Sequence, residues 1–267
     1  MKKIVADTHV HLYPCYGFEE VFRSARTNLG RLAGDGADTV FLLFLTERSG
    51  SRAFQDLAEG KTAMPSGWQA KPLADENAFC VQSTEDQARL CVLNGRQIVT
   101  RERLELLALA GNPDVPDGED ARQVIEAIQA AGAVPVLPWA PGKWLFERGR
   151  VVEGLLRDFQ PTQLLIGDTA LRPAGWGEPR LMCQALDRGF KIVAGTDPLP
   201  FAGEERGIGR YGVAWNGELG EYSLVRDIRR MLLDPQCVMR TVGERGGLLT
   251  VTRRLIRLHQ VRRAGHA

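Results

Sequence analysis

Residues 3–11 read KIVADTHVH, a short apolar run followed at once by Asp7, His9 and His11. The apolar part predicts a strand over residues 3–6. In extended chain, residues two positions apart point to the same side, so the three polar side chains share one face. Two imidazoles directed at one point are typical of a divalent metal site. The segment therefore predicts a strand that ends in candidate metal ligands.

The rest of the chain alternates short apolar runs with amphipathic segments. Further strands are predicted over residues 39–45, 104–109, 133–137, 163–166 and 191–194, with weaker ones over 211–215 and 238–242. Helices are predicted over residues 18–32, 119–131, 143–159, 180–188, 221–233 and 248–263. Strands that alternate with helices indicate parallel β/α units. We therefore expect an α/β fold, a TIM-like (β/α)7-8 barrel; only five or six strands would instead form an open doubly wound sheet.

One segment interrupts this alternation, because residues 68–100 are strand-like without an intervening helix. Within it, Asn94-Gly95 predicts the type I′ turn of a β-hairpin, since both residues tolerate a positive φ. We interpret residues 60–102 as a β insertion within a single barrel domain that spans residues 1–267. Such an insertion can cap the mouth of an active site, or it can serve as a stability or dimer arm.

Composition excludes a disordered or fibrous chain, because 44% hydrophobic and 25% charged residues are ordinary globular values. The formal net charge of +1 gives no global sign of a nucleic-acid partner. Residues 222–267 hold ten Arg against three acidic residues, but such a stretch is more often the solvated face of a helix. We therefore expect a small-molecule substrate and no nucleic acid, with a homo-oligomer left open.

The N-terminus lacks the apolar core of a signal peptide, and no run of about 18 apolar residues predicts a membrane span. The five cysteines are scattered without a CxxC spacing. This pattern favours a reduced, cytoplasmic protein. Cys80 and Cys91 could face each other across a hairpin, but we interpret both as buried thiols.

A second candidate group follows a late predicted strand, in the sequence AGTDPLP at residues 194–200. Pro198 is expected to hold Asp197 extended rather than helical. A carboxylate at this place can ligate a metal or act as the catalytic base on water, or it can simply shape a turn. Asp168 follows another predicted strand and is a candidate additional ligand, since carboxylate oxygens bind Zn and suit Mn or Mg.

Four cations are candidates for binding an anionic substrate. Lys143 lies at a strand-to-helix turn, where exposed amides also favour anions. Arg172, Arg206 and Arg210 fall in loops after predicted strands, where they could grip a carboxylate or phosphate. Glu47 could reach the active-site mouth of the predicted barrel, and it is equally well explained as a solvated acidic residue in a loop.

The two motifs, at residues 7–11 and 194–200, resemble those of a known superfamily. His9, His11 and Asp197 occupy the positions at which metal-dependent hydrolase (amidohydrolase-like) TIM barrels open with His-x-His and close with Asp. The Asp-x-His-x-His opening, with a following Tyr-Pro, also resembles the polymerase-and-histidinol-phosphatase (PHP) barrels. Both resemblances imply a divalent metal, Zn, Mn or Mg, that activates water to hydrolyse a small, anionic substrate.

The chain departs from both families in its histidines, because none occurs between His11 and His259. The PHP pattern also fails at Leu199, where a His would complete Asp-x-His. Any metal site is therefore predicted to be mononuclear. Three hypotheses follow: an amidohydrolase-like hydrolase, a PHP-like phosphoesterase, and a non-catalytic barrel with a degenerate metal site that acts as a binding module.

Overall fold

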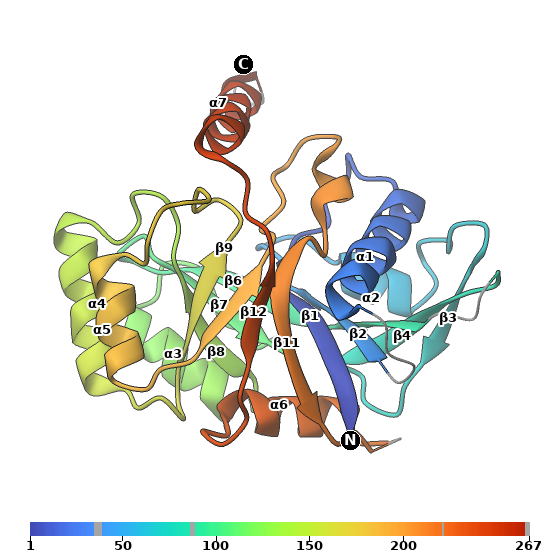
Figure 1. The fold of residues 1–267 in the computed structure, drawn as a ribbon, viewed down its shortest axis with the longest axis horizontal. Coiled ribbons are helices and arrows are strands. Elements are labelled where there is room, and N and C mark those ends of the chain that lie inside the picture. The colour runs from blue at the N-terminus through green and yellow to red at the C-terminus, as the bar shows by residue number, and fades with distance from the viewer. Residues whose placement is uncertain (35–38, 86–88, 221, 265–267) are drawn as a thin grey trace.

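The structure, a computed structural model, describes residues 1–34, 39–85, 89–220 and 222–264 (Figure 1). The strands in these ranges are β1 Lys2–Val10, β2 Thr39–Leu45, β3 Trp68–Pro72, β4 Ala78–Ser83, β5 Arg89–Leu93, β6 Gly95–Val99, β7 Glu105–Leu109, β8 Val134–Pro138, β9 Leu165–Thr169, β10 Ile192–Gly195, β11 Tyr211–Gly217 and β12 Arg240–Gly243. The helices are α1 Phe18–Ala33, α2 Ala53–Ala58, α3 Ala121–Ala130, α4 Phe146–Asp158, α5 Arg180–Asp187, α6 Leu224–Leu233 and α7 Leu248–Ala264, with the short 3-10 helix η1 Glu204–Gly207.

The predicted order of strands and helices is confirmed. The strand over residues 39–45 has the predicted bounds, and the two weaker strands are present as β11 and β12. The helix predicted over 221–233 begins at Leu224, and position 221 lies outside the described residues. The first strand is longer than predicted: β1 continues to Val10, so Asp7 and His9 are part of the strand, and His11 follows directly after it.

The strands form two mixed sheets, and the predicted TIM-like barrel is wrong. One sheet has seven strands in the order β12-β11-β1-β2-β5-β4-β3, and the other has five in the order β10-β9-β8-β7-β6. A (β/α) barrel needs parallel neighbours throughout. Here β1 pairs antiparallel with β11, and β7 pairs antiparallel with both β6 and β8. These antiparallel steps interrupt the β/α order, and within the described ranges no continuous ladder closes the two sheets into a barrel.

The two sheets nevertheless approach each other closely where β10 lies beside β1. The Thr8 hydroxyl donates a hydrogen bond to the carbonyl oxygen of Ala194 at 2.9 Å. Gly195 permits this approach, because a Cβ at that position would overlap the backbone nitrogen of His9 and lie 2.9 Å from an Asp7 carboxylate oxygen. The sequence Ala-Gly-Thr-Asp therefore uses its glycine to bring the end of β10 against the end of β1.

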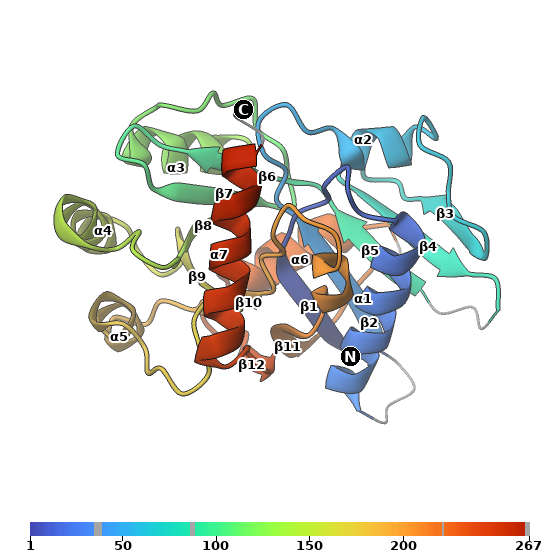
Figure 2. The same cartoon turned by 90° about the horizontal axis from the view of Figure 1, so that it is seen from above.

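Helices cover both sheets on their outer faces. In Figure 1, α1 and α2 lie over the seven-stranded sheet, α3, α4 and α5 over the five-stranded sheet, and α6 across the lower end of both. Apolar residues from both sheets and from α6 form one buried core between the layers. The carboxyl ends of β1 and β10 are thereby left at the upper end, where α7 crosses the molecule (Figure 2).

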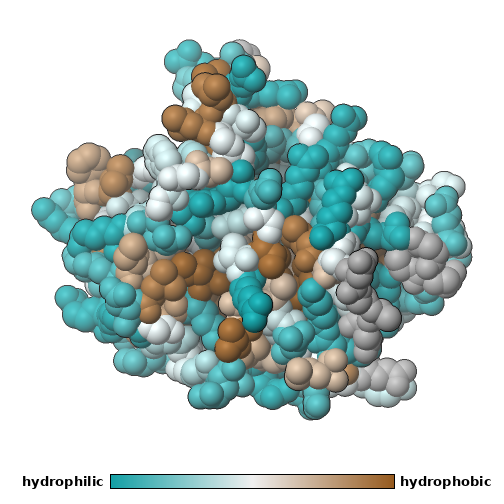
Figure 3. Space-filling model, viewed as in Figure 1, coloured by the Kyte–Doolittle hydropathy of each residue, from teal (hydrophilic) through white to brown (hydrophobic). Residues whose placement is uncertain are grey.

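Helix α7 buries little of its own surface. Among its residues only Val251 is classed as buried, and Leu255 and Leu258 pack partly against Leu171 and Phe201. Figure 3 shows apolar side chains at the surface of α7, at the top of the view. None of the described helices is long and apolar enough to cross a membrane.

The hairpin predicted at Asn94-Gly95 is wrong. β5 belongs to the seven-stranded sheet and β6 to the five-stranded sheet, so the chain crosses from one sheet to the other at this point. Gly95 is required by crowding rather than by a turn, because a Cβ there would overlap the Leu45 carbonyl oxygen and lie 2.6 Å from that of Ala108. Within the segment interpreted as an insertion, β3, β4 and β5 extend one sheet and β6 forms the edge of the other.

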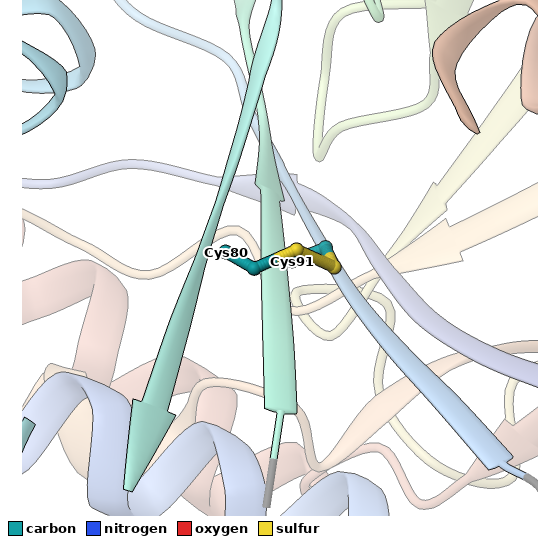
Figure 4. Close-up of a disulfide and its surroundings, with 2 residues drawn as sticks. All are labelled: Cys80 and Cys91. Carbon is teal, nitrogen blue, oxygen red and sulfur yellow. A yellow bond between two sulfur atoms is a disulfide. The ribbon is translucent and has the colours of Figure 1, made fainter. Parts of the chain in front are cut away.

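The interpretation of Cys80 and Cys91 as thiols is also wrong, because the two form a disulfide (Figure 4). They are direct partners in the antiparallel pairing of β4 with β5, and their Cα atoms lie 4.0 Å apart. The pairing was not predictable from spacing, since the partner of Cys80 depends on the register of the two strands. Cys15, Cys183 and Cys237 are free thiols.

Candidate metal centre

The end of β1 supplies two imidazoles to one buried point. His9 and His11 are 3% and 4% exposed, and their Nε2 atoms lie 3.1 Å apart. This geometry follows from the strand period of two, which places both rings on the same face. The Nδ1 atoms of both rings are buried and have no hydrogen-bond partner among the described residues.

Asp197 completes the group from the end of β10. Its Oδ1 lies 3.6 Å from Nε2 of His9 and 3.5 Å from Nε2 of His11. One ligand atom from each of the three side chains therefore lies within 4.8 Å of the others. Burial raises the pKa of Asp197, but the two imidazoles outweigh it and hold that pKa at about 2. The carboxylate is therefore ionised and available as a ligand at neutral pH.

The backbone of Asp197 differs from the prediction, because its φ is +48° instead of extended. Asp is among the residues that tolerate this region best, although it remains unusual outside glycine. The conformation is fixed by an amide hydrogen bond from Asp197 to the His9 carbonyl oxygen at 2.9 Å. This bond ties the loop after β10 to β1 and directs the carboxylate toward the imidazoles.

Asp7 organises the site without joining the group of three. It is fully buried, and it accepts hydrogen bonds from the amides of His9, Thr196 and Gly209 and from the Thr196 hydroxyl. Burial raises the pKa of Asp7 to about 6, against the opposing effect of these hydrogen bonds. Asp7 thus connects β1 to the residues that follow β10 and η1.

Asp168 and Arg172 form an ion pair with each other. Arg172 donates from Nε and Nη2 to the two Asp168 oxygens at 2.8 and 2.6 Å, and Tyr211 donates its hydroxyl to Asp168 at 2.5 Å. Both side chains of the ion pair are buried. Asp168 is therefore outside the group formed by the two histidines and Asp197, and Arg172 already has a carboxylate partner.

The other three residues predicted to bind an anionic substrate lie at two different places. Lys143 Nζ lies 3.1 Å from a carboxylate oxygen of Glu105. Arg206 and Arg210 line a separate cavity beside the segment that carries Thr196. Glu47 is 5% exposed, and its Oε1 accepts the Phe54 amide at the start of α2. Glu47 is thus engaged in capping α2.

Sequence reasoning missed the groups that face the imidazoles from the second sheet. Burial lowers the pKa of His9, and the carboxylates of Asp197 and Glu105 act in the opposite direction. The Gln97 side chain, from β6, also raises the pKa of His9. No sequence signal identifies Gln97 or Glu105, because they lie on β6 and β7 in the five-stranded sheet and act on His9 of the other sheet only in the folded chain.

Tyr13 completes the surroundings on the side of β1. Its ring centroid lies 5.6 Å from that of His11, and a second contact of 5.4 Å joins it to Tyr16. Burial raises the pKa of Tyr13, so its hydroxyl stays protonated at neutral pH. Tyr13 therefore offers a neutral donor close to the imidazoles.

Comparisons with known proteins identify the fold but not a family. No protein-family model matches the sequence, and a search of curated proteins finds no match. Among solved structures, PsfC from Pseudomonas syringae PB-5123 is 14% identical, with a TM-score of 0.56 over 99% of both chains. The lesion-specific endonuclease PfuEndoQ from Pyrococcus furiosus is 9% identical, with a TM-score of 0.53 over 90% of this chain and 57% of that one. The chain shares the fold of both proteins, and it spans just over half of the endonuclease.

A third structure overturns the expectation of no nucleic-acid partner. Endonuclease Q, in complex with a 27-mer duplex that carries an abasic lesion, is 10% identical with a TM-score of 0.50 over 86% of this chain and 56% of that one. A fold of this kind therefore occurs in a protein that binds nucleic acid. The net charge of +1 does not exclude such a partner, because an average over the chain conceals local groups such as the ten Arg of residues 222–267. None of these structures supports the amidohydrolase resemblance.

Proposed function

We propose that this chain is a metal-dependent phosphoesterase whose divalent cation is held by His9, His11 and Asp197. The observation that carries the proposal is the convergence of two imidazole nitrogens and one carboxylate oxygen within 4.8 Å. This donor set suits Zn or Mn, and each family of ligand occurs at these metals in proteins. The Asp-x-His-x-His opening, which resembles PHP barrels, agrees with the same assignment.

The phosphoester class is favoured by the neighbours in fold. An endonuclease cleaves phosphodiester bonds, and PfuEndoQ is described as one. We therefore favour a phosphoryl centre over a carbonyl centre as the point of attack. When bound, a divalent cation supplies Lewis acidity to a phosphoryl oxygen and lowers the pKa of a water molecule toward neutrality.

The residues of the chain have separate roles in this proposal. Burial, which lowers the pKa of His9, favours the neutral form of that ligand, and the ionised Asp197 adds the negative charge that balances the cation. We assign to the second oxygen of Asp197 the role of a base that would accept a proton from water. Tyr13, whose ring packs against His11, and Lys143, which Glu105 holds by an ion pair, are assigned as donors to the substrate phosphate.

Elemental analysis of protein prepared without a polyhistidine tag tests the proposal. We expect bound Zn or Mn in the unmodified protein, and none in the double variant His9→Ala/His11→Ala. The variant His259→Ala, on α7, is the matched control and should retain the metal. Hydrolysis of bis-p-nitrophenyl phosphate with added Mn should fall to background only in the double variant. Equal metal content in the double variant would overturn the assignment, and an unmodified protein that binds no metal would favour the binding-module hypothesis.

A further inference from the structure

A cavity of about 840 Å³ lies beside the candidate metal centre and is separate from it. Its walls come from α1, η1, the loop after β12 and the start of α7. Thr196 and Pro198 line the cavity, whereas the metal-ligand side chains of His9 and His11 do not. The cavity therefore lies on the other side of the segment that carries Asp197.

Positive charge dominates the lining. The cationic lining residues are Arg31, Arg206, Arg210, Arg245 and Arg254, and the acidic ones are Glu204 and Glu244, a net of three positive charges. Excess charge of one sign around a concave surface attracts ions of the opposite sign. Nothing in the metal-centre proposal uses this charge.

Several of these guanidinium groups have only a distant carboxylate partner or none among the described residues. Arg254 is engaged, with contacts of 2.6 to 3.0 Å to Glu204. Arg206 reaches Glu20 only at 3.8 Å. Among the described residues, Arg31 and Arg210 have no side-chain ion pair. These side chains are free to bind an anion that enters the cavity.

Arg245, which lines the cavity, has an unsatisfied guanidinium nitrogen. Its Nη1 atom is buried and has no hydrogen-bond partner among the described residues. Its Nη2 makes one long contact of 3.5 Å, to the carbonyl oxygen of Trp176. A buried, unpaired guanidinium nitrogen is costly, and an anion in the cavity would satisfy it.

The amino end of α7 adds to the positive electrostatic potential in the cavity. Gly246 and Thr250 line the cavity, and α7 begins between them at Leu248. The first turn of α7 contains no acidic residue. The free amides and the positive dipole end of a helix favour an anion at such a place.

We propose that this cavity binds a phosphate-bearing small molecule of about nucleotide size, at a site distinct from the metal centre. Guanidinium groups bind phosphate oxygens through paired, charge-assisted hydrogen bonds, which a single carboxylate cannot match in number. A volume of about 840 Å³ falls within the usual range for pockets that hold small ligands. Occupancy would act on the metal centre through Arg254, whose Nη2 contacts the carbonyl oxygen of Asp197 at 3.3 Å.

Calorimetric titration of pyrophosphate into the full chain, kept free of metal with EDTA, tests the proposal. We expect saturable binding that weakens about tenfold or more in Arg210→Ala and in Arg245→Ala, because each loses charged hydrogen bonds to the anion. Arg226→Ala, in which an exposed α6 residue is removed, is the matched control and should bind as the unmodified protein does. Arg210 is exposed, so its variant keeps the fold even if Arg245→Ala does not.

Two outcomes would overturn the proposal. One is that the arginines prove not to matter, shown either by an absence of pyrophosphate binding or by equal binding in Arg210→Ala and Arg226→Ala. The other is citrate binding as tightly as pyrophosphate, which would assign the cavity to carboxylates. Because metal is removed throughout, the result does not depend on whether the chain is a phosphoesterase.

Discussion

The Nε2 atoms of His9 and His11 lie 3.1 Å apart, and a single oxygen of Asp197 stands at nearly equal distance from both. A neutral imidazole carries one ring proton, so with that proton on Nδ1 each Nε2 keeps a lone pair that can bind a cation at the common point. Burial, which lowers the pKa of His9, favours the neutral form needed for ligation. The arrangement is thus already suited to a cation.

Metal removal is expected to lower stability. A cation that binds only the folded chain stabilises it by about 2.7 kcal/mol at a free concentration a hundred times its Kd. We expect the Tm, measured by scanning calorimetry, to fall after chelation with EDTA and to recover with Zn or Mn. The double variant His9→Ala/His11→Ala should show no response to either treatment. A Tm that ignores chelation in metal-loaded, unmodified protein would contradict the prediction.

Gly195→Ala is expected to disrupt the contact between β10 and β1. The added Cβ would lie 2.5 Å from the Cβ of His9, so one strand must move. We expect a loss of about 1–3 kcal/mol in the free energy of unfolding, together with weaker metal binding. Gly30→Ala in α1 is the control, because no atom lies within 4 Å of its added Cβ. Urea titration followed by circular dichroism compares the two, and an equal response would show that the close approach is unimportant.

Arg172→Met is expected to be strongly destabilising. The substitution leaves the buried Asp168 carboxylate without its bidentate partner, which typically costs about 3–5 kcal/mol. The matched control is Arg150→Met, whose ion pair with Glu147 is exposed and contributes less than about 1 kcal/mol. Chemical denaturation measures both. If Arg172→Met were as stable as Arg150→Met, the ion pair would have no structural role.

Reduction of the Cys80–Cys91 disulfide is expected to destabilise the sheet at β4 and β5. The Cys80–Cys91 disulfide closes a loop with a sequence separation of 11, and such a crosslink typically contributes about 2–4 kcal/mol. Peptide mapping without reductant should recover the two cysteines as one linked species, and Cys237 as an alkylated thiol. Addition of dithiothreitol should then lower the unfolding midpoint in urea. Recovery of Cys80 and Cys91 as alkylated thiols would refute the pairing.

The candidate site was predictable to the extent that local geometry determines it. The alternation of side chains along an extended strand placed His9 and His11 together, and the position of Asp197 after a strand identified the third member of the group. Asp168 was a poorer inference. It also follows a strand, but only the packing of Tyr211 and Arg172 around it determines where its two oxygens are used.

The sequence by itself determined the order of strands and helices, since apolar periodicity reports which faces of each segment are buried. It also determined the paired imidazoles, because His9 and His11 lie two residues apart where β1 ends. Only the tertiary structure decided the two mixed sheets, the disulfide, the partner of Arg172 and the arginine-lined cavity. Each of these depends on which strands become neighbours and in what register, and that choice is made by contacts between residues far apart in the chain.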